Sequence, residues 1–142
     1  MSDCVFCRIT AGAEPSVTVF EDESTLAFMD AFPGSDGHLL VVPKRHSRDL
    51  LEIPEDDLLA VTRTARRLAR AVVEELGADG VNLLNNCGAQ AWQSVFHFHM
   101  HVIPRYADGS KDSLTLPWPV GVPGDPELRA DLGARLTSAL QG

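Results

Sequence analysis

The chain has 142 residues, the usual size of one compact domain, and 44% of them are hydrophobic, which is enough for one core. Its formal net charge is −8, and an acidic protein repels phosphate polyanions, so we expect no nucleic-acid partner. No apolar run reaches the roughly 18–20 residues that span a bilayer, so no membrane association is expected. Residues 1–4 lack the basic and apolar regions of a signal peptide, which predicts a cytoplasmic location and reduced cysteines.

The first part of the chain has the pattern of a short antiparallel sheet. Residues 4–13 form a short segment that we expect to be a helical turn or an ordered arm. Short β-prone runs follow, separated by polar or glycine- and proline-rich turns. The polar stretch 21–24 joins the first two runs and predicts a hairpin. We expect these strands over residues 17–20, 26–29 and 38–42, the last one ended by Pro43.

A long amphipathic helix is predicted over residues 54–76. Its apolar residues recur at steps of three and four, which places them on one face. Pro54 suits the first helical position, and Gly77 is a natural C-terminal stop. Two further strands are expected over residues 81–86 and 95–103.

The chain changes character after Arg105. Residues 116–126 are rich in proline and glycine and predict an irregular loop, after which Asp125 would cap a last helix that has Pro126 at its first position. Strands that come mainly in sequence, with one long helix inserted, predict an α+β domain with an antiparallel sheet. We expect the apolar stripe of each helix to pack in the core. In the last helix this stripe consists of Leu128, Leu132, Leu136 and Leu140.

Histidines occupy alternate positions in the expected strand over residues 95–103. Side chains alternate between the two faces of a strand, so one face would be apolar and would cover the core. A half-exposed strand explains the alternation but does not explain three histidines in one row. We therefore expect the other face, directed to solvent, to carry chemistry. It holds His97, His99 and His101.

A single metal centre made of all three histidines is disfavoured. On a straight strand the outer two Cα atoms lie about 13 Å apart, whereas a metal–nitrogen bond is about 2.0–2.1 Å long. Histidine titrates at about pH 6.5, so a neutral imidazole is available at neutral pH as a nucleophile. The middle residue, His99, has a neighbour on each side. One neighbour can fix its tautomer while the other meets a developing anionic oxygen.

The alternation of histidine with apolar residues from His97 to Ile103 resembles the signature of the histidine-triad (HIT) superfamily. The resemblance extends to Asp30, to residues 38–46 and to residues 86–96, and it covers about residues 4–105. It implies an α+β, HIT-like fold with a five-stranded antiparallel sheet, one long helix and a C-terminal helix. The chain would be a single domain over residues 1–142, with its core at 4–105 and a C-terminal loop and helix at 106–142.

The resemblance also implies an activity. His99 would attack the α-phosphorus of a purine nucleoside 5′-phosphoramidate or a related nucleotide conjugate, and water would then release the nucleoside monophosphate. Two alternatives remain. One is hydrolysis of dinucleoside polyphosphates by the same histidine, and the other is a nucleotide-binding interaction protein with weak catalysis.

Individual roles follow only from the resemblance. The carbonyl of His97 would hold the ring of His99, and Asp30 would bind the ribose hydroxyls. Ala91 and Trp92 stand where much of the family has glycines, and Trp92 would either narrow the leaving-group side or cover the loop. The expected contacts to the phosphate or the leaving group are His38, His101, Gln93, Ser94 and Asn86, and the expected base pocket is Phe6, Ile9 and Phe28.

Cys4 and Cys7 have the spacing of half a zinc site. A thioredoxin-like role is disfavoured because the pair opens the chain and does not follow a strand; two buried unpaired cysteines are the alternative to zinc. The resemblance is to a bacterial branch that completes the site with the equivalents of His46 and His97, which implies one structural zinc ion. The family also pairs two such sheets, which implies a homodimer.

Overall fold

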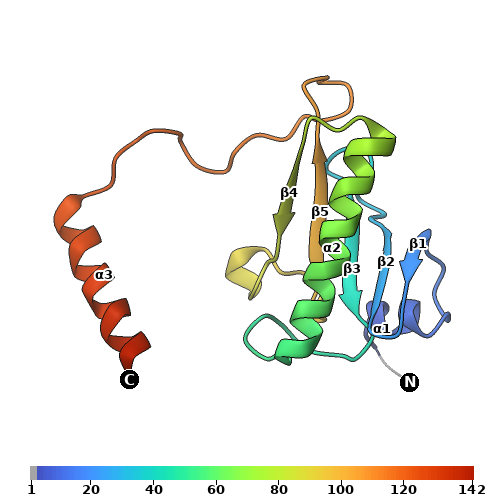
Figure 1. Ribbon diagram of the computed structural model, residues 1–142, viewed down its shortest axis with the longest axis horizontal. Coiled ribbons are helices and arrows are strands. Elements are labelled where there is room, and N and C mark those ends of the chain that lie inside the picture. Colours follow the sequence, from blue (N-terminus) through green and yellow to red (C-terminus); the bar gives the residue numbers. More distant parts are fainter. Residues whose placement is uncertain (1–2) are drawn as a thin grey trace.

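A five-stranded antiparallel sheet forms the body of the protein in a computed structural model that describes residues 3–142 (Figure 1). The strand order is β1-β2-β3-β5-β4, so β1 and β4 are the two edges. This arrangement confirms the fold class expected from the sequence, including the hairpin between the first two strands. The strands are β1 (Thr18–Glu21), β2 (Thr25–Met29), β3 (Leu39–Pro43), β4 (Gly80–Leu84) and β5 (Met100–Arg105).

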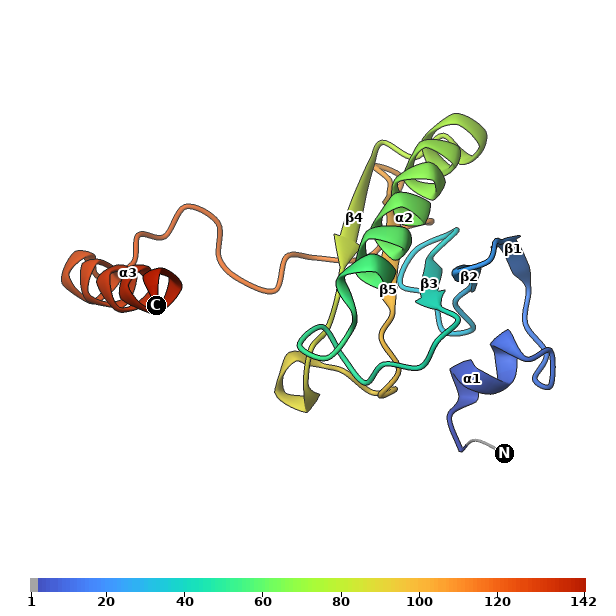
Figure 2. The same ribbon diagram turned by 60° about the horizontal axis from the view of Figure 1, so that its bottom comes forward.

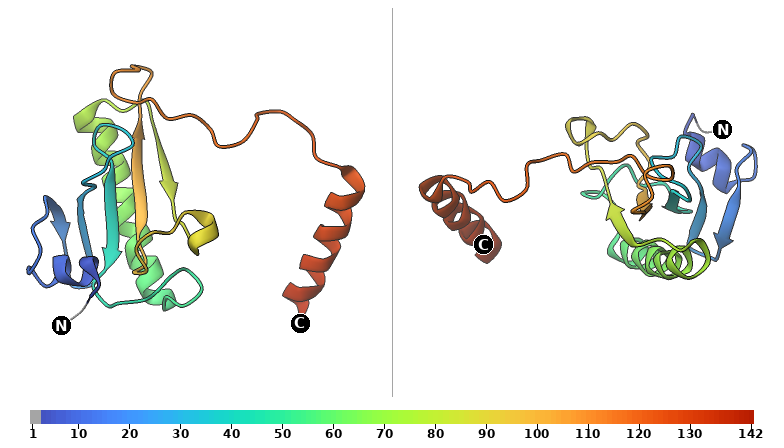
Figure 3. Two further views of the ribbon diagram at one scale, coloured as in Figure 1. Left: turned by 180° about the vertical axis from the view of Figure 1, so that it is seen from behind. Right: turned by 90° about the horizontal axis from the view of Figure 1, so that it is seen from above.

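The helices cover the sheet unequally. The long helix α2 (Glu55–Leu76) lies along one face, and the short helix α1 (Val5–Thr10) lies against the other (Figure 3). Pro54 is the N-cap of α2 and not its first residue, and Gly77 ends the helix in the left-handed conformation, with φ 70°. The remaining elements are a single 3-10 turn (Ala89–Ala91) and α3 (Pro126–Gln141).

The middle strands are buried on both faces, and alternation divides their side chains between two apolar clusters. Ala27, Leu39 and Val41 pack with the apolar stripe of α2. Their sequence neighbours point the other way, where they pack with Phe6 of α1. This second cluster places α1 over the sheet face that carries the triad histidines. The residues that pack with Phe6 there are Leu26, Phe28, Leu40 and Val42.

The strand expected over residues 95–103 is shorter and lies further along the chain. β5 begins at Met100, so His97 and His99 precede it. The ladder with β3 ends at the pair Val41–Met100. Before it the chain bonds elsewhere: the amide of Phe98 donates to the carbonyl of Ser47 at 2.7 Å, and Nε2 of His97 donates to the carbonyl of Pro43 at 2.9 Å. The predicted alternation nevertheless holds for the core side, because Phe98 and Val102 are buried in the α2 cluster.

The last helix departs from the expectation that its leucines pack in the core. α3 begins as predicted, with Asp125 as its N-cap and Pro126 at its start, but every one of its residues is exposed. An extended segment carries the helix away from the sheet (Figures 1 and 2). Prolines at 117, 119 and 123 keep that segment out of regular structure, so the leucine stripe has no surface of the same chain to cover.

Among the helices of residues 3–142, none combines the length and the apolar character needed to cross a membrane.

Candidate active site

A cavity of about 800 Å³ opens between α1, β2 and the segment leading into β5. One part of its wall is apolar and comes from α1 and β2, and another part consists of His99 and His101. Asp30 and Ser94 also line it. The cavity therefore brings together seven of the residues singled out in the sequence. The apolar members are Phe6, Ile9 and Phe28.

The orientation of His99 is fixed by its backbone neighbour. Nδ1 of His99 lies 2.8 Å from the carbonyl oxygen of His97, and since a carbonyl only accepts, this nitrogen carries the hydrogen. Burial lowers the pKa of His99, partly offset by that hydrogen bond and by Asp30. The ring is therefore neutral at neutral pH, and its lone pair is on Nε2. A neutral imidazole in this tautomer is the form that can act as a nucleophile.

The histidine face is covered, and in this respect the sequence-based expectation of a solvent-facing row is wrong. His97 is 0% exposed and His99 is 5% exposed. The cause is α1: the ring of Phe6 makes edge-to-face contacts with both, at centroid distances of 5.9 Å and 5.1 Å. His99 is thus held in a largely desolvated position at the wall of the cavity, where hydrogen bonds and charges act more strongly than in water.

His38 and His101 form a directional pair beside His99. The amide of Gly34 donates to Nδ1 of His38 at 2.9 Å, so the hydrogen of a neutral His38 is on Nε2. That nitrogen lies 2.9 Å from Nδ1 of His101 and donates to it. The hydrogen of His101 is therefore on its own Nε2. Burial, reinforced by repulsion from His99 and His38, lowers the pKa of His101 to about 4, which keeps it neutral.

Asp30, His38 and His101 lie close enough together to suggest a second metal site. The hydrogen-bond pattern argues against that reading. Nε2 of His38 carries a hydrogen because Nδ1 already accepts from an amide, and a protonated nitrogen cannot ligate a metal. The same nitrogen lies 3.5 Å from a carboxylate oxygen of Asp30, which favours an N–H there. Burial lowers the pKa of His38 and Asp30 opposes this effect.

The loop between β4 and β5 holds the predicted site residues Asn86, Gln93 and Ser94, and of these only Ser94 lines the cavity. Gln93 is buried, and both ends of its amide bind backbone: Oε1 accepts from Gly88 N at 2.7 Å, and Nε2 donates to Arg48 O at 2.8 Å. Asn86 makes a long contact of 3.5 Å to the carbonyl of Trp92. In this conformation Gln93 shapes the loop and does not face His99.

Asn85 is a residue that the sequence analysis passed over. Its Nδ2 donates to the carbonyl oxygen of His99 at 2.9 Å, so it supports the backbone of the central histidine. Its Oδ1 is buried and has no hydrogen-bond partner within the described part of the chain. The only available signal was its position beside Asn86, and no local pattern separates the two asparagines.

The two N-terminal cysteines meet two histidines on the same side of the sheet. His46 Nδ1 and His97 Nδ1 are 3.2 Å apart, and Sγ of Cys7 lies 3.3 Å and 3.5 Å from these two nitrogens. Sγ of Cys4 lies 3.4 Å from His97 Nδ1. Tetrahedral zinc with bonds of about 2.0–2.3 Å holds its ligand atoms about 3.3–3.8 Å apart, so the spacing suits that ion.

The tautomer of His97 also suits a metal ligand. Its Nε2 donates to the carbonyl of Pro43, which leaves the lone pair on Nδ1, the nitrogen that faces the cysteine sulfurs. Burial lowers the pKa of His97 to about 4, so the ring is neutral. The structure thus brings together the two cysteines that the sequence spacing assigned to zinc and the two histidines, His46 and His97, that the family resemblance added. Two thiolates and two imidazoles form a closed set that could hold one ion.

Comparisons with known proteins all find similarity to HIT-domain or histidine triad proteins. A family model described as the HIT domain matches residues 11–108. The adenylylsulfatase HINT3 of Arabidopsis thaliana is 41% identical over 104 residues, which are 73% of this chain and 53% of that protein. A HIT-family crystal structure from Bacillus subtilis has a TM-score of 0.86 and 38% identity over 96% of both chains. A zinc-bound histidine triad family protein from Mycobacterium smegmatis has a TM-score of 0.74 and 39% identity over 96% of this chain and 97% of its own.

Proposed function

This chain belongs to the HIT-domain family, and from that premise we propose that it cleaves nucleotide conjugates at the α-phosphate through a covalent intermediate on His99. The observation that carries the proposal is the orientation of His99. Its Nδ1–H is held by the carbonyl of His97, so the lone pair on Nε2 is available at the wall of a cavity large enough for a nucleotide.

The reaction has two steps. Nε2 of His99 forms a bond to the α-phosphorus as the bond to the leaving group breaks, and water then attacks the same phosphorus to release the nucleoside monophosphate and free His99. The Nε2–H of His101 donates to a phosphate oxygen, on which negative charge develops in both steps. Because rings 99 and 101 have centroids 5.1 Å apart, a phosphate can contact both.

The cavity also supports a nucleoside as the group transferred. Its apolar wall suits a purine base, which has a large flat surface, and Asp30 offers carboxylate oxygens to the ribose hydroxyls. Asp30 is held by the amide of Phe32, which donates to its Oδ1 at 2.9 Å. Base, ribose and phosphate would then lie in order from Phe6 and Phe28, past Asp30, to the histidines.

The leaving group is a separate question, and we place a nucleoside 5′-phosphoramidate first. The relative named an adenylylsulfatase supports an adenylyl compound as substrate, with sulfate as the group that departs. A dinucleoside polyphosphate is the second candidate, since the same histidine would attack the same phosphorus. A nucleotide-binding protein with weak catalysis is the third, and the lone pair on Nε2 of His99 beside a donor at Nε2 of His101 argues against it.

The experiment compares wild type with His99→Ala on adenosine 5′-phosphoramidate, adenosine 5′-phosphosulfate and a diadenosine polyphosphate. All three share the adenylyl group and differ in the leaving group. Loss of a covalent nucleophile should reduce turnover by several powers of ten, each worth about 1.4 kcal/mol in the barrier. Denaturation during turnover at alkaline pH, which preserves a phosphorus–nitrogen bond, should leave a nucleoside monophosphate on His99 of the wild type. Activity of His99→Ala within tenfold of wild type, at an unchanged unfolding temperature, would contradict the mechanism.

We further propose that Cys4, Cys7, His46 and His97 hold one structural zinc ion. The ligand spacing and the tautomer of His97 support this, and so does the zinc-bound relative. Zinc bound there joins the α1 end of the chain to the segment after β3. His97 would then be fixed at its side chain by the metal site and would fix His99 through its carbonyl, so the site would steady the nucleophile without taking part in the reaction.

We also propose a homodimer. β4 is an edge of the sheet, and its Leu83 and Leu84 are exposed, as are Val73 and Leu76 of the neighbouring helix α2. An exposed apolar edge strand is a template for pairing with a second strand. The dimer proposal is supported by this exposed apolar surface and by helix α3, whose exposed leucines could pack against a second copy of the chain. Analytical ultracentrifugation should show a dimer for wild type and a shift to monomer for Leu83→Lys; a wild-type monomer at micromolar concentration would contradict the proposal.

A further inference from the structure

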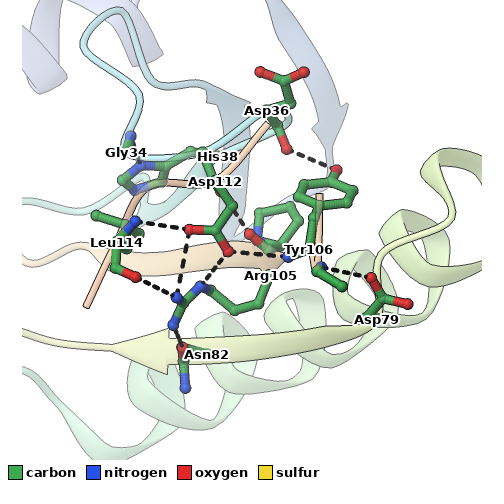
Figure 4. Close-up of polar contacts among 12 residues, drawn as sticks. Gly34, Asp36, His38, Asp79, Asn82, Arg105, Tyr106, Asp112 and Leu114 are labelled. Carbon is green, nitrogen blue, oxygen red and sulfur yellow. Dashed lines mark hydrogen bonds and ion pairs between the residues drawn. The ribbon is translucent and has the colours of Figure 1, made fainter. Parts of the chain in front are cut away.

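A short segment after β5, the Asp112 loop (residues 106–114), folds back onto the end of the sheet (Figure 4). Its centre is the carboxylate of Asp112, whose side chain is 2% exposed. Arg105 Nε donates to it at 2.7 Å, and the amides of Tyr106 and Leu114 donate at 2.9 Å each. One carboxylate thus closes the loop at both ends, and Arg105 also donates to the carbonyl of Leu114 at 3.0 Å.

The Asp112 loop is joined to a second segment, the Gly34 turn (residues 33–37), which leads into β3. The amide of Asp36 donates to the carbonyl of Lys111 at 2.9 Å, and the hydroxyl of Tyr106 donates to the carbonyl of Asp36 at 2.8 Å. A lone β-bridge joins Ser35 to Asp112. These contacts fix the two segments to each other although about 75 residues separate them in the sequence.

Leu114 is the point where the Asp112 loop presses on Gly34. A Cβ placed on Gly34 would come within 3.2 Å of Cδ1 of Leu114, so even a methyl group at position 34 would crowd the Leu114 side chain. The amide of Gly34 is the group that donates to Nδ1 of His38, and His38 in turn donates to His101. A continuous set of contacts therefore runs from Asp112 to the wall of the cavity.

We infer that Asp112 is a positioning residue for the reaction: acting through Leu114 and Gly34, it holds His38 in the tautomer that makes His101 a donor at Nε2. The inference rests on the proposed function for its effect on turnover. Asp112 itself lies outside the cavity lining and touches none of the reacting atoms. Its role is to keep one amide hydrogen directed at one ring nitrogen.

The consequence of losing this contact follows from imidazole chemistry. If the Gly34 amide no longer points at Nδ1, a neutral His38 can place its hydrogen on either nitrogen, and Asp30, 3.5 Å from Nε2, is the group that still favours the Nε2–H tautomer. In the Nδ1–H tautomer its Nε2 becomes an acceptor, so His101 would turn its own hydrogen to Nδ1 and present a lone pair to the phosphate. A lone pair facing an anionic oxygen repels it, so the transition state would lose a hydrogen bond and gain a repulsion.

The test uses Asp112→Ala and Leu114→Ala, which remove the two ends of the pathway, with Asp108→Ala as the matched control. Asp108 is an aspartate of the same loop, but its carboxylate accepts hydrogen bonds from Ser110 and makes none of the contacts that join Asp112 to Arg105 and Leu114. Side-chain 15N NMR of the histidines should show His38 and His101 protonated at Nε2 in wild type and in the control. In the two test variants we expect a mixture of tautomers at both rings.

Steady-state kinetics with adenosine 5′-phosphoramidate provide the second measurement. We expect kcat to fall by about tenfold or more in both test variants, because the hydrogen bond is made most strongly in the transition state, with KM changed by less than about threefold. The control should keep both constants. Leu114 is 39% exposed, so Leu114→Ala should fold, and it decides the question alone if Asp112→Ala does not fold.

A folded test variant that keeps the histidine tautomers of wild type and a kcat within threefold of wild type would overturn the inference. A His38 that is protonated at Nδ1 in the wild-type protein would overturn it too. The NMR measurement requires no turnover. If His99→Ala kept its activity, the proposed function would fail, while the histidine spectra would still decide whether Asp112 positions His38.

Discussion

His38 donates from Nε2 to Nδ1 of His101 across 2.9 Å, and the direction of this hydrogen bond decides what the cavity offers to a phosphate. It leaves His101 with a donor at Nε2, while His99, held by the carbonyl of His97, has a lone pair at Nε2. Two adjacent rings of the same residue type thus perform opposite tasks. The difference comes from their hydrogen-bond partners and not from their positions along the chain.

The first prediction concerns that direction. His38→Leu removes the donor to His101 and should lower kcat by about 100- to 1,000-fold, the range for a lost transition-state hydrogen-bond donor. His38→Gln places an amide N–H near the position of Nε2 and should recover most of the loss. Stopped assays with adenosine 5′-phosphoramidate would measure both. Equal kcat for the two variants would show that His38 does not act by donating to His101.

The second prediction is a pH dependence of stability. Hydrogen bonds from Arg105, Tyr106 N and Leu114 N lower the pKa of Asp112 to about 2, below the value of about 3.9 for an unfolded aspartate. The ionised carboxylate therefore stabilises the fold above about pH 4, and this contribution is lost as the pH falls toward 2. Wild type should unfold at a higher temperature than Asp112→Asn at pH 7, and the difference should shrink between pH 4 and pH 2.

The histidines also titrate in acid, but they do so in both proteins, so the difference between wild type and Asp112→Asn isolates the carboxylate. A difference in unfolding temperature that stays constant from pH 7 to pH 2.5 would contradict the assignment.

The third prediction concerns metal content. Protein purified without chelator or nickel resin should carry about one zinc per chain, and Cys4→Ser/Cys7→Ser should carry almost none. The double variant should unfold at a lower temperature but keep measurable turnover, because the closed ligand set has no open position for a reacting water. Elemental analysis and thermal unfolding are the measurements.

Cys87→Ser is the matched control for the zinc experiment, because Cys87 is a half-buried cysteine outside the cluster. It should retain the metal and the unfolding temperature of wild type. A folded double variant that loses zinc and all activity would mean that the metal is catalytic. A wild type that takes up no zinc would leave the two cysteines as packing residues.

The fourth prediction uses backbone strain at Trp92, which is the single non-glycine residue with positive φ among residues 3–142, at 74°. The left-handed conformation costs a residue with a side chain about 1–2 kcal/mol, whereas the added chain entropy of glycine costs about 0.5–1 kcal/mol. The ring is 64% exposed, so few contacts would be lost. Trp92→Gly should therefore leave the free energy of unfolding unchanged or raise it by up to about 1 kcal/mol.

Ala91→Gly is the control for Trp92→Gly, because Ala91 is the preceding residue and has no positive φ that glycine could relieve. It should lower the free energy of unfolding by about 0.5–1 kcal/mol. Urea unfolding of the three proteins would measure both effects. If Trp92→Gly were the less stable of the two variants, the ring would be making contacts that outweigh the strain.

Much of the sheet and the long helix could be predicted from the sequence because their signals are local. The steps of three and four in α2, and the alternation of apolar residues around Phe98, report geometry that depends on neighbouring residues alone. The same alternation placed the triad histidines on one face. The resemblance to a known family added the chemistry of His99 and the four zinc ligands, which the structure brings together.

The sequence could not predict what covers each face. The histidine row was expected to meet solvent, but α1 lies over it, because Phe6 finds its apolar partners on strands that come 20 to 36 residues later. The stripe of α3 has the periodicity of a packed helix, yet every residue of α3 is exposed in the described part of the chain. Periodicity reports that a face is apolar, and it carries no information about which surface that face meets.

The sequence by itself determined the approximate strands, the long helix and the alternation of three histidines with core residues, since these depend on repeats of two and 3.6 residues. Only the tertiary structure decided that His97 turns its side chain to the cysteines while His99 faces the cavity, and that Asp112 lies at the end of a path to His38. Those outcomes depend on hydrogen bonds between segments that are distant in sequence, whose direction is set by packing.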